Sequence, residues 1–111
     1  MTQAHTSTLV QATPADVDSL IAAANAAGKP VFVDFWAPWC APCKGMTPKI
    51  EQLAKDRPDV TFLAVNVDDC TECALKHGIR SVPTFKVLKD GVALRTSVGA
   101  QPAEKLAQML G

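Results

Sequence analysis

Apolar residues follow two patterns along this chain: short continuous runs, and repeats with helical spacing. Continuous runs rich in β-branched and aromatic residues predict strands at 31–37, 60–67 and 84–89. The first run, VFVDFWA, is apolar on both faces, which is typical of a central strand covered by helices on both sides. A further strand is predicted at 92–98, because Asp90-Gly91 before it is a strong hairpin signal.

Apolar residues at helical spacing predict a first helix that begins near residue 13 and ends at Gly28. We expect Thr13 to cap this helix and Pro14 to occupy its first position, where a missing N–H costs little. Asp16 would lie in the first turn, where a negative charge is favourable. Gly28 is a natural stop because glycine adopts the conformation that ends helices.

Three more helices are predicted further along the chain. The second runs from about Cys40 to Asp56 and contains Pro48, which should kink it because proline has no N–H to donate. The third is a short helix within 68–78, for which Asp69 is the expected cap. The last begins near Pro102 and is amphipathic.

Leu9 and Val10 complete the pattern as a short edge strand, and the predicted order is β-α-β-α-β-α-β-β-α. Strands that alternate with helices imply parallel crossovers, whereas the hairpin adds an antiparallel end. The sequence therefore predicts an α/β fold with a central mixed five-stranded sheet flanked by four helices. Residues 1–7 are polar and expected to be flexible, and residues 8–111 are expected to form a single domain.

Charge and length narrow the range of functions. The 111 residues carry 11 basic and 11 acidic side chains, which argues against a main role in binding nucleic acid or anionic membranes. No apolar run reaches membrane-spanning length, and the N-terminus does not have the pattern of a signal peptide. We expect a cytoplasmic protein, most simply a monomer.

The segment WAPWCAPCK, residues 36–44, concentrates the reactive chemistry. Cys40 follows a strand and opens a helix, where unpaired N–H groups and the helix dipole favour the reactive thiolate, and Lys44 adds positive charge. Cys43 lies one helical turn further on, within reach of a disulfide that forms and breaks through a mixed disulfide. Inert core thiols and half of a zinc site are the alternatives, although no C-x-x-C…H-x-x-H pattern follows.

This segment resembles the active site of the thioredoxin family in Trp36-Ala37-x-Trp39-Cys40-x-Pro42-Cys43-Lys44. The resemblance extends in order through further positions that match family features: Asp34, Pro48, 78–84, Gly91 and 98–100. It covers nearly the whole chain from about residue 8 and implies the thioredoxin fold.

The resemblance implies a thiol–disulfide oxidoreductase that reduces disulfides in client proteins and carries electrons for cell redox homeostasis. Cys40 would be the attacking thiolate, Cys43 the resolving thiol, and Asp34 a buried base that accepts a proton from Cys43. No cofactor would be bound, and electrons would come from NADPH through thioredoxin reductase. The residues expected to contact the substrate are Trp39, Ala41, Pro42, Val82, Pro83, Gly99 and Ala100, with the Val82–Pro83 bond expected to be cis.

Some of these residues also have a simpler interpretation. Asp34 could instead point to solvent by strand alternation, Gly99 and Ala100 could form a plain turn at a strand end, and both tryptophans could be core residues. The resemblance favours Trp39 as the exposed tryptophan.

Two positions depart from the family pattern. Ala64 stands where the family often has a lysine paired with the buried aspartate. An unpaired carboxyl in an apolar strand should have a raised pKa, so we expect Asp34 to titrate higher than is usual for the family. Ala41 stands between the cysteines at a position where the family most often has a glycine. The histidine that oxidising relatives typically have between their cysteines is also absent. We therefore expect a reducing protein rather than an oxidase or isomerase.

A second C-x-x-C pair, Cys70 and Cys73, has surroundings of opposite charge. Asp68, Asp69 and Glu72 should raise the pKa of these thiols and make them less reactive than the first pair. Three interpretations stay open: passive thiols, a regulatory disulfide, or a zinc site shared by both pairs.

The sequence thus supports three functional hypotheses. The first is a cytoplasmic protein-disulfide reductase, and the second is a specialised relative that serves one partner with Cys70–Cys73 as a switch. The third is a zinc-binding or scaffold protein without turnover. His5 and His77 are expected to be inert surface residues, and no metal site is assigned.

Overall fold

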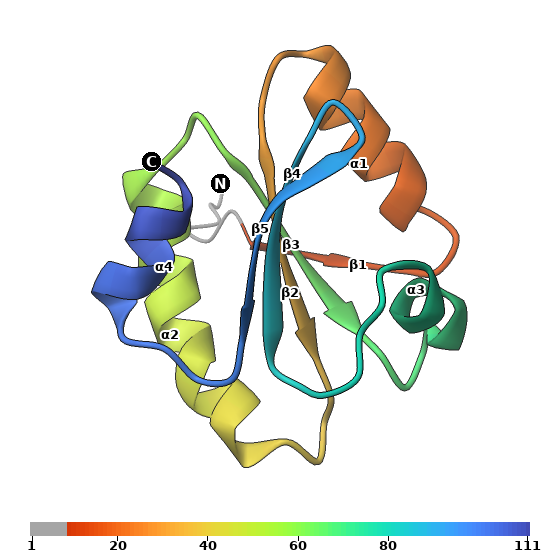
Figure 1. Cartoon of the computed structure of the whole chain (residues 1–111), viewed down its shortest axis with the longest axis vertical. Coiled ribbons are helices and arrows are strands. Elements are labelled where there is room, and N and C mark those ends of the chain that lie inside the picture. The colour runs from red at the N-terminus through yellow and green to blue at the C-terminus, as the bar shows by residue number, and fades with distance from the viewer. Residues whose placement is uncertain (1–8) are drawn as a thin grey trace, which may run out of the picture.

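The computed structural model describes residues 9–111, which form nine elements in the predicted order (Figure 1). The strands are β1 (Leu9–Ala12), β2 (Val31–Trp36), β3 (Thr61–Asn66), β4 (Thr84–Lys89) and β5 (Val92–Val98). The helices are α1 (Val17–Ala26), α2 (Ala41–Asp56), α3 (Thr71–Lys76) and α4 (Ala103–Met109). The predictions for the flexible segment 1–7 and for His5 lie outside the described residues.

All five strands form one sheet in the order β1-β3-β2-β4-β5. Strand β3 runs parallel to both β1 and β2, whereas β4 runs antiparallel to both β2 and β5. The β4–β5 hairpin turns at Asp90 and Gly91, whose φ angles of 55° and 77° fit the tight turn predicted for this dipeptide. The mixed five-stranded sheet is confirmed.

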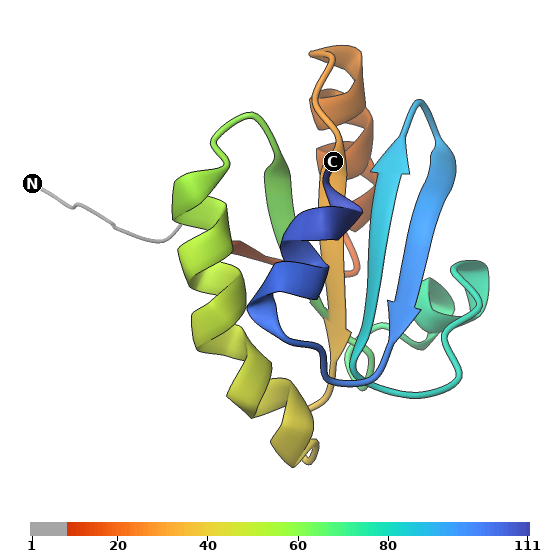
Figure 2. The ribbon, with the colours of Figure 1, turned by 60° about the vertical axis from the view of Figure 1, so that its left-hand side comes forward.

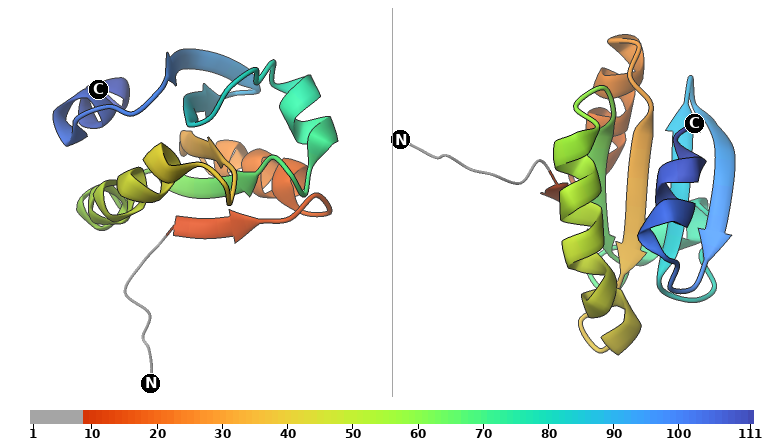
Figure 3. Two further views of the ribbon diagram at one scale, coloured as in Figure 1. Left: turned by 90° about the horizontal axis from the view of Figure 1, so that it is seen from below. Right: turned by 90° about the vertical axis from the view of Figure 1, so that its left-hand side faces the viewer.

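Helices cover both faces of the sheet (Figures 2 and 3). Along β2, Val31, Val33 and Phe35 belong to the core cluster beneath α1 and α3. Phe32 points to the opposite face and packs with the apolar residues of α2 and α4. Its ring centroid lies 5.2 Å from that of Phe62 and 5.8 Å from that of Phe85. This division explains why the strand is apolar at nearly every position.

The predicted cap of α1 is wrong, although its end is confirmed. Asp16, not Thr13, is the residue that precedes the helix, and α1 begins at Val17. The Thr13 carbonyl accepts the N–H groups of Asp16 and Val17, and the Asp16 carboxylate accepts the Thr13 N–H at 2.6 Å. These bonds close a turn over residues 13–16, so Pro14 lies before the helix. Gly28, with φ +80°, ends it as predicted.

The predicted cap of α3 is also wrong by one residue. Cys70 is the N-cap, and its sulfur accepts the Cys73 N–H at 3.2 Å. Asp69 is occupied elsewhere, because its N–H donates to the Asn66 carbonyl and its carboxylate accepts the Asn66 side-chain amide. The helix ends before Gly78, whose φ is +69°, as predicted.

The second and fourth helices begin where the sequence predicts. Cys40 is the N-cap of α2, which runs through Pro48 to Asp56, and Pro102 precedes α4. Within residues 9–111, no helix is both long enough and apolar enough to cross a membrane.

Candidate active site

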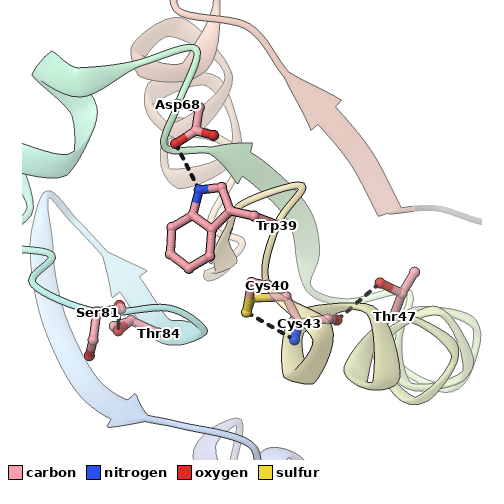
Figure 4. The surroundings of a disulfide bond; sticks show 7 residues. All are labelled: Trp39, Cys40, Cys43, Thr47, Asp68, Ser81 and Thr84. Carbon is pink, nitrogen blue, oxygen red and sulfur yellow. Dashed lines mark hydrogen bonds between the residues drawn. A yellow bond between two sulfur atoms is a disulfide. The ribbon is translucent and has the colours of Figure 1, made fainter.

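Cys40 and Cys43 are joined by a disulfide at the start of α2, with their Cα atoms 5.3 Å apart (Figure 4). Cys40 is extended, with φ −92° and ψ 100°, and its sulfur accepts the Cys43 N–H at 3.2 Å. Pro42 costs no hydrogen bond here because it lies in the first helical turn. Once the bond is reduced, this N–H and the dipole of the 16-residue helix favour a thiolate on Cys40.

Residues from two other segments pack beside this disulfide. Val67 and Val82 pack against the small cluster that contains both cysteines. The Val82–Pro83 bond is cis, as the resemblance implies. The Pro83 carbonyl accepts the Gly99 N–H at 2.8 Å, which brings Gly99 beside Pro83. The fold thus places Gly99 next to Pro83 although β4 and β5 lie between them in the sequence.

The side chain of Trp39 is 71% exposed beside the disulfide, whereas Trp36 is half-buried. This confirms Trp39 as the exposed tryptophan. Its indole N–H donates to the Asp68 carboxylate at 3.4 Å (Figure 4). The sequence predicts Asp68 only as an acidic neighbour of Cys70. No spacing signal could reveal its contact with Trp39, because the two residues are 29 positions apart.

Asp34 is buried in the centre of the sheet, with 3% of its surface exposed. The register places it beside Ala64 of β3 on one side and Phe85 of β4 on the other. Burial in these apolar surroundings raises the pKa of Asp34 from 3.8 to about 7. The register confirms Ala64 as the neighbour of Asp34, and the burial of Asp34 shows that its solvent-facing alternative is wrong.

A cavity of about 220 Å³ connects Asp34 with Cys43, since both residues line it. Trp36 also lines this cavity. Asp34 Oδ1 and Trp36 Nε1 are both buried, and neither atom has a hydrogen-bond partner within the part of the chain that the structure describes. The space is large enough for water, which could serve both polar atoms. The remaining lining residues are Leu9, Gln11, Lys44, Thr47 and Ala64. No sequence signal predicts that Gln11 and Thr47 line this cavity, because only the fold brings β1 against α2.

The second cysteine pair is also closed as a disulfide, with Cα atoms 5.2 Å apart. Cys70 and Cys73 belong to the core cluster beneath α1 and α3, apart from the cluster around Cys40. Among residues 9–111, no group of three or more histidine, cysteine or acidic side chains is arranged to hold a metal ion.

His77 does not lie on the open surface, contrary to expectation. It is partly buried at the end of α3, and its ring centroid lies 5.4 Å from that of Phe35. Burial, followed by the nearby charges of Lys86 and Lys76, lowers the pKa of His77. Its position at the edge of the core gives it a packing role.

Comparison with known proteins decides the family. The sequence model of the thioredoxin family matches residues 8–111. The chain belongs to the thioredoxin family. A thioredoxin from Bacillus subtilis is 44% identical over 81 residues, which cover 72% of this chain and 78% of that protein. A chloroplastic M-type thioredoxin from Triticum aestivum is 44% identical over 82 residues, which cover 73% of this chain and 47% of that protein.

Solved structures of family members have the same fold. The thioredoxin of Fasciola hepatica superposes with a TM-score of 0.82 at 40% identity, covering 92% of this chain and 95% of that one. A chain from a complex of ferredoxin: thioredoxin reductase and thioredoxin f2 has a TM-score of 0.82 at 32% identity and covers 94% of each chain. Family membership and the Cys40–Cys43 pair together identify a thiol–disulfide oxidoreductase with protein-disulfide reductase activity.

Proposed function

We propose that Cys40 is the attacking thiolate and Cys43 the resolving thiol in the reduction of client-protein disulfides. Cys40 attacks one client sulfur, forms a mixed disulfide and releases the other client sulfur as a thiolate, which takes up a proton. Cys43 then loses its proton and attacks Cys40, which re-forms the Cys40–Cys43 disulfide and releases the second client thiol. The observation that carries this assignment is the Cys43 N–H, which lies 3.2 Å from the Cys40 sulfur at the helix start.

Asp34 is the proposed acceptor for the proton that Cys43 loses. The two residues line the same cavity, and a carboxyl with a pKa of about 7 is suited to exchange protons near neutral pH. A water molecule in this cavity would carry the proton between them. The burial of Asp34 therefore serves the second half of the reaction, when the mixed disulfide is resolved.

The proposed client-binding surface surrounds the disulfide. Trp39 supplies a large exposed aromatic contact, and the backbone near Val82 is suited to pair with an extended client segment. The remaining residues assigned to this surface are Ala41, Pro42, Pro83, Gly99 and Ala100.

Electrons are proposed to come from NADPH through thioredoxin reductase, with no cofactor bound to this chain. A structural neighbour solved together with a ferredoxin: thioredoxin reductase supports a reductase as partner. We further propose that residues 8–111 act as a single domain in a cytoplasmic monomer.

The roles of the two cysteines can be tested by trapping the mixed disulfide. Cys43→Ser should accumulate a covalent complex with a disulfide-bonded client such as insulin, and a reductant should cleave this complex. Cys40→Ser should form no such complex. Cys73→Ser is the matched control, because it removes the equivalent cysteine of the second pair and should leave turnover intact. Accumulation with Cys40→Ser instead would reverse the assignment.

The electron donor can be tested with purified reductases. NADPH consumption in the presence of insulin and a generic NADPH-dependent thioredoxin reductase should require Cys40 and Cys43. No consumption with that enzyme, but turnover with a chemical dithiol, would indicate a specialised protein with another donor.

A further inference from the structure

Cys70 and Cys73 repeat the local geometry of the active-site pair. In each pair the first cysteine is an N-cap whose sulfur lies 3.2 Å from the N–H of the second. The Cα separations are 5.3 Å for the first pair and 5.2 Å for the second. Cys70 and Cys73 are each 6% exposed, against 4% for Cys40 and 2% for Cys43. The second pair is therefore no less accessible than the pair that carries the family's reaction.

The second pair also has a cavity of its own. A space of about 270 Å³ is lined by Cys70 and Cys73 together with residues from the start of α1 and from α3. Its exposed lining residues include Asp18, Asp69 and Glu72, so the cavity reaches solvent. This volume lies just below the range of typical small-molecule pockets, roughly 300 to 1,000 Å³. It suits a small disulfide rather than a folded client.

Charge around this cavity favours cations. Its lining includes three carboxylates and one ammonium group, that of Lys76. The Lys76 ammonium lies 3.0 Å from the Asp18 carboxylate, so this positive charge is already paired. Asp69 and Glu72 are left to attract an incoming cation and to repel an anion.

We propose that Cys70 and Cys73 form a second redox-active dithiol–disulfide, which exchanges electrons with small cationic disulfides. The Cys70 thiolate attacks one sulfur of the small disulfide, forms a mixed disulfide and releases the other sulfur as a thiolate, which takes up a proton from solvent. Cys73 then gives up its proton to solvent, and its thiolate attacks the Cys70 sulfur and displaces the second small thiol. Two electrons pass from the protein dithiol to the small disulfide, and the reverse reaction opens Cys70–Cys73 again.

Cys70 is the attacking residue because its sulfur accepts the Cys73 N–H. A hydrogen bond to the charged form of a thiol favours the thiolate and offsets part of the repulsion from the acidic neighbours. The proposal does not depend on the roles assigned to Cys40 and Cys43, because the two pairs lie in separate clusters.

The test uses the full chain with Cys40→Ser and Cys43→Ser, in which only the second pair can react. The reduced protein is exposed to one of two redox buffers, a mixture of cystamine and cysteamine or a mixture of oxidised and reduced glutathione. Free thiols are then alkylated, and the peptides are analysed by mass spectrometry. We expect Cys70–Cys73 to close as a pair in a single two-electron transition. Closure should be faster with the cationic cystamine than with the anionic glutathione disulfide, on the order of tenfold at low salt, and added salt should reduce this difference.

Two further variants make the outcome specific. Added to the same background, Cys73→Ser should stop at a mixed disulfide on Cys70, and Glu72→Gln should close with a smaller preference for cystamine. Closure of Cys70–Cys73 is also measured in the unsubstituted chain, as a control for a folding defect in the serine variants. Alkylation of both cysteines under every buffer would overturn the second redox centre. Closure at equal rates with both disulfides would overturn the proposed substrate class.

Discussion

Asp34 in β2 lies directly beside Ala64 in β3, so a methyl group is the neighbour of a buried carboxyl across the parallel strands. Burial is what raises the pKa of Asp34 to about 7. The cavity that Asp34 shares with Cys43 also borders Ala64, so a longer side chain at this position would enter the space next to both groups.

Ala64→Lys should lower the pKa of Asp34 well below 7. The added ammonium group would stabilise the carboxylate across the strand pair, and an opposite charge within a few ångström favours the charged form of an acid. An NMR titration of the Asp34 carboxyl carbon measures the change directly. Ala64→Met is the control for filled space without charge, and it should leave the pKa at or above about 7. Equal values in the two variants would contradict an electrostatic effect.

Asp34→Asn should stabilise the fold at alkaline pH. Because the folded-state pKa is about 7 and the ordinary value is 3.8, the folded protein keeps a proton that the unfolded chain loses between these values. The stability of the parent therefore falls as pH rises through this window, by up to about 4 kcal/mol. Chemical denaturation of the oxidised proteins should show the variant more stable at about pH 8 and the two nearly equal at about pH 4. The same difference at both pH values would argue against titration of Asp34.

The rate of client reduction should rise as pH increases through about 7, where Asp34 becomes ionised and able to accept a proton. Asp34→Asn should lower the rate and remove this rise, because the amide cannot take the proton from Cys43. The pH dependence of kcat/KM with insulin is the measurement. An unchanged profile in the variant would show that the proton goes elsewhere.

Trp39→Ala should weaken the reduction of protein clients more than that of a small aromatic disulfide. Trp39 is 71% exposed next to the disulfide, and an aromatic side chain of this kind often dominates a contact surface. We expect kcat/KM for insulin to fall by about tenfold, which corresponds to about 1.4 kcal/mol. Leu75→Ala is the matched control, since Leu75 is 82% exposed on α3 and lies outside the proposed client surface. Equal losses in both variants would remove the special role of Trp39.

Phe32→Ala should destabilise the fold by about 3–5 kcal/mol. The side chain is fully buried, and its ring contacts those of Phe62 and Phe85 at the centre of the α2 and α4 side of the core. Phe32→Leu keeps most of the apolar volume and should cost much less. Urea denaturation of the two variants gives the comparison, and a small loss in Phe32→Ala would show that the core can collapse around the missing ring.

Sequence patterns predicted the elements of this fold well but not the starts of two helices. The bounds of β4 and β5 match the predicted 84–89 and 92–98, because the apolar run and the Asp90-Gly91 turn are local properties. The caps of α1 and α3 could not be read locally. Thr13 and Asp69 are both able to cap a helix, yet each is held in a turn by neighbouring groups.

The sequence by itself determined the reactive pair, the helix start that favours its thiolate and the order of strands and helices. Each depends on residues a few positions apart, whose geometry is fixed by local backbone conformation. Only the tertiary structure decided that Asp68 contacts Trp39, that Gln11 and Thr47 border the space between Asp34 and Cys43, and that Cys70 and Cys73 open into a cavity beside α1. These contacts form because elements that are distant in the sequence pack together, and the pattern of residues within a short stretch of sequence carries no information about them.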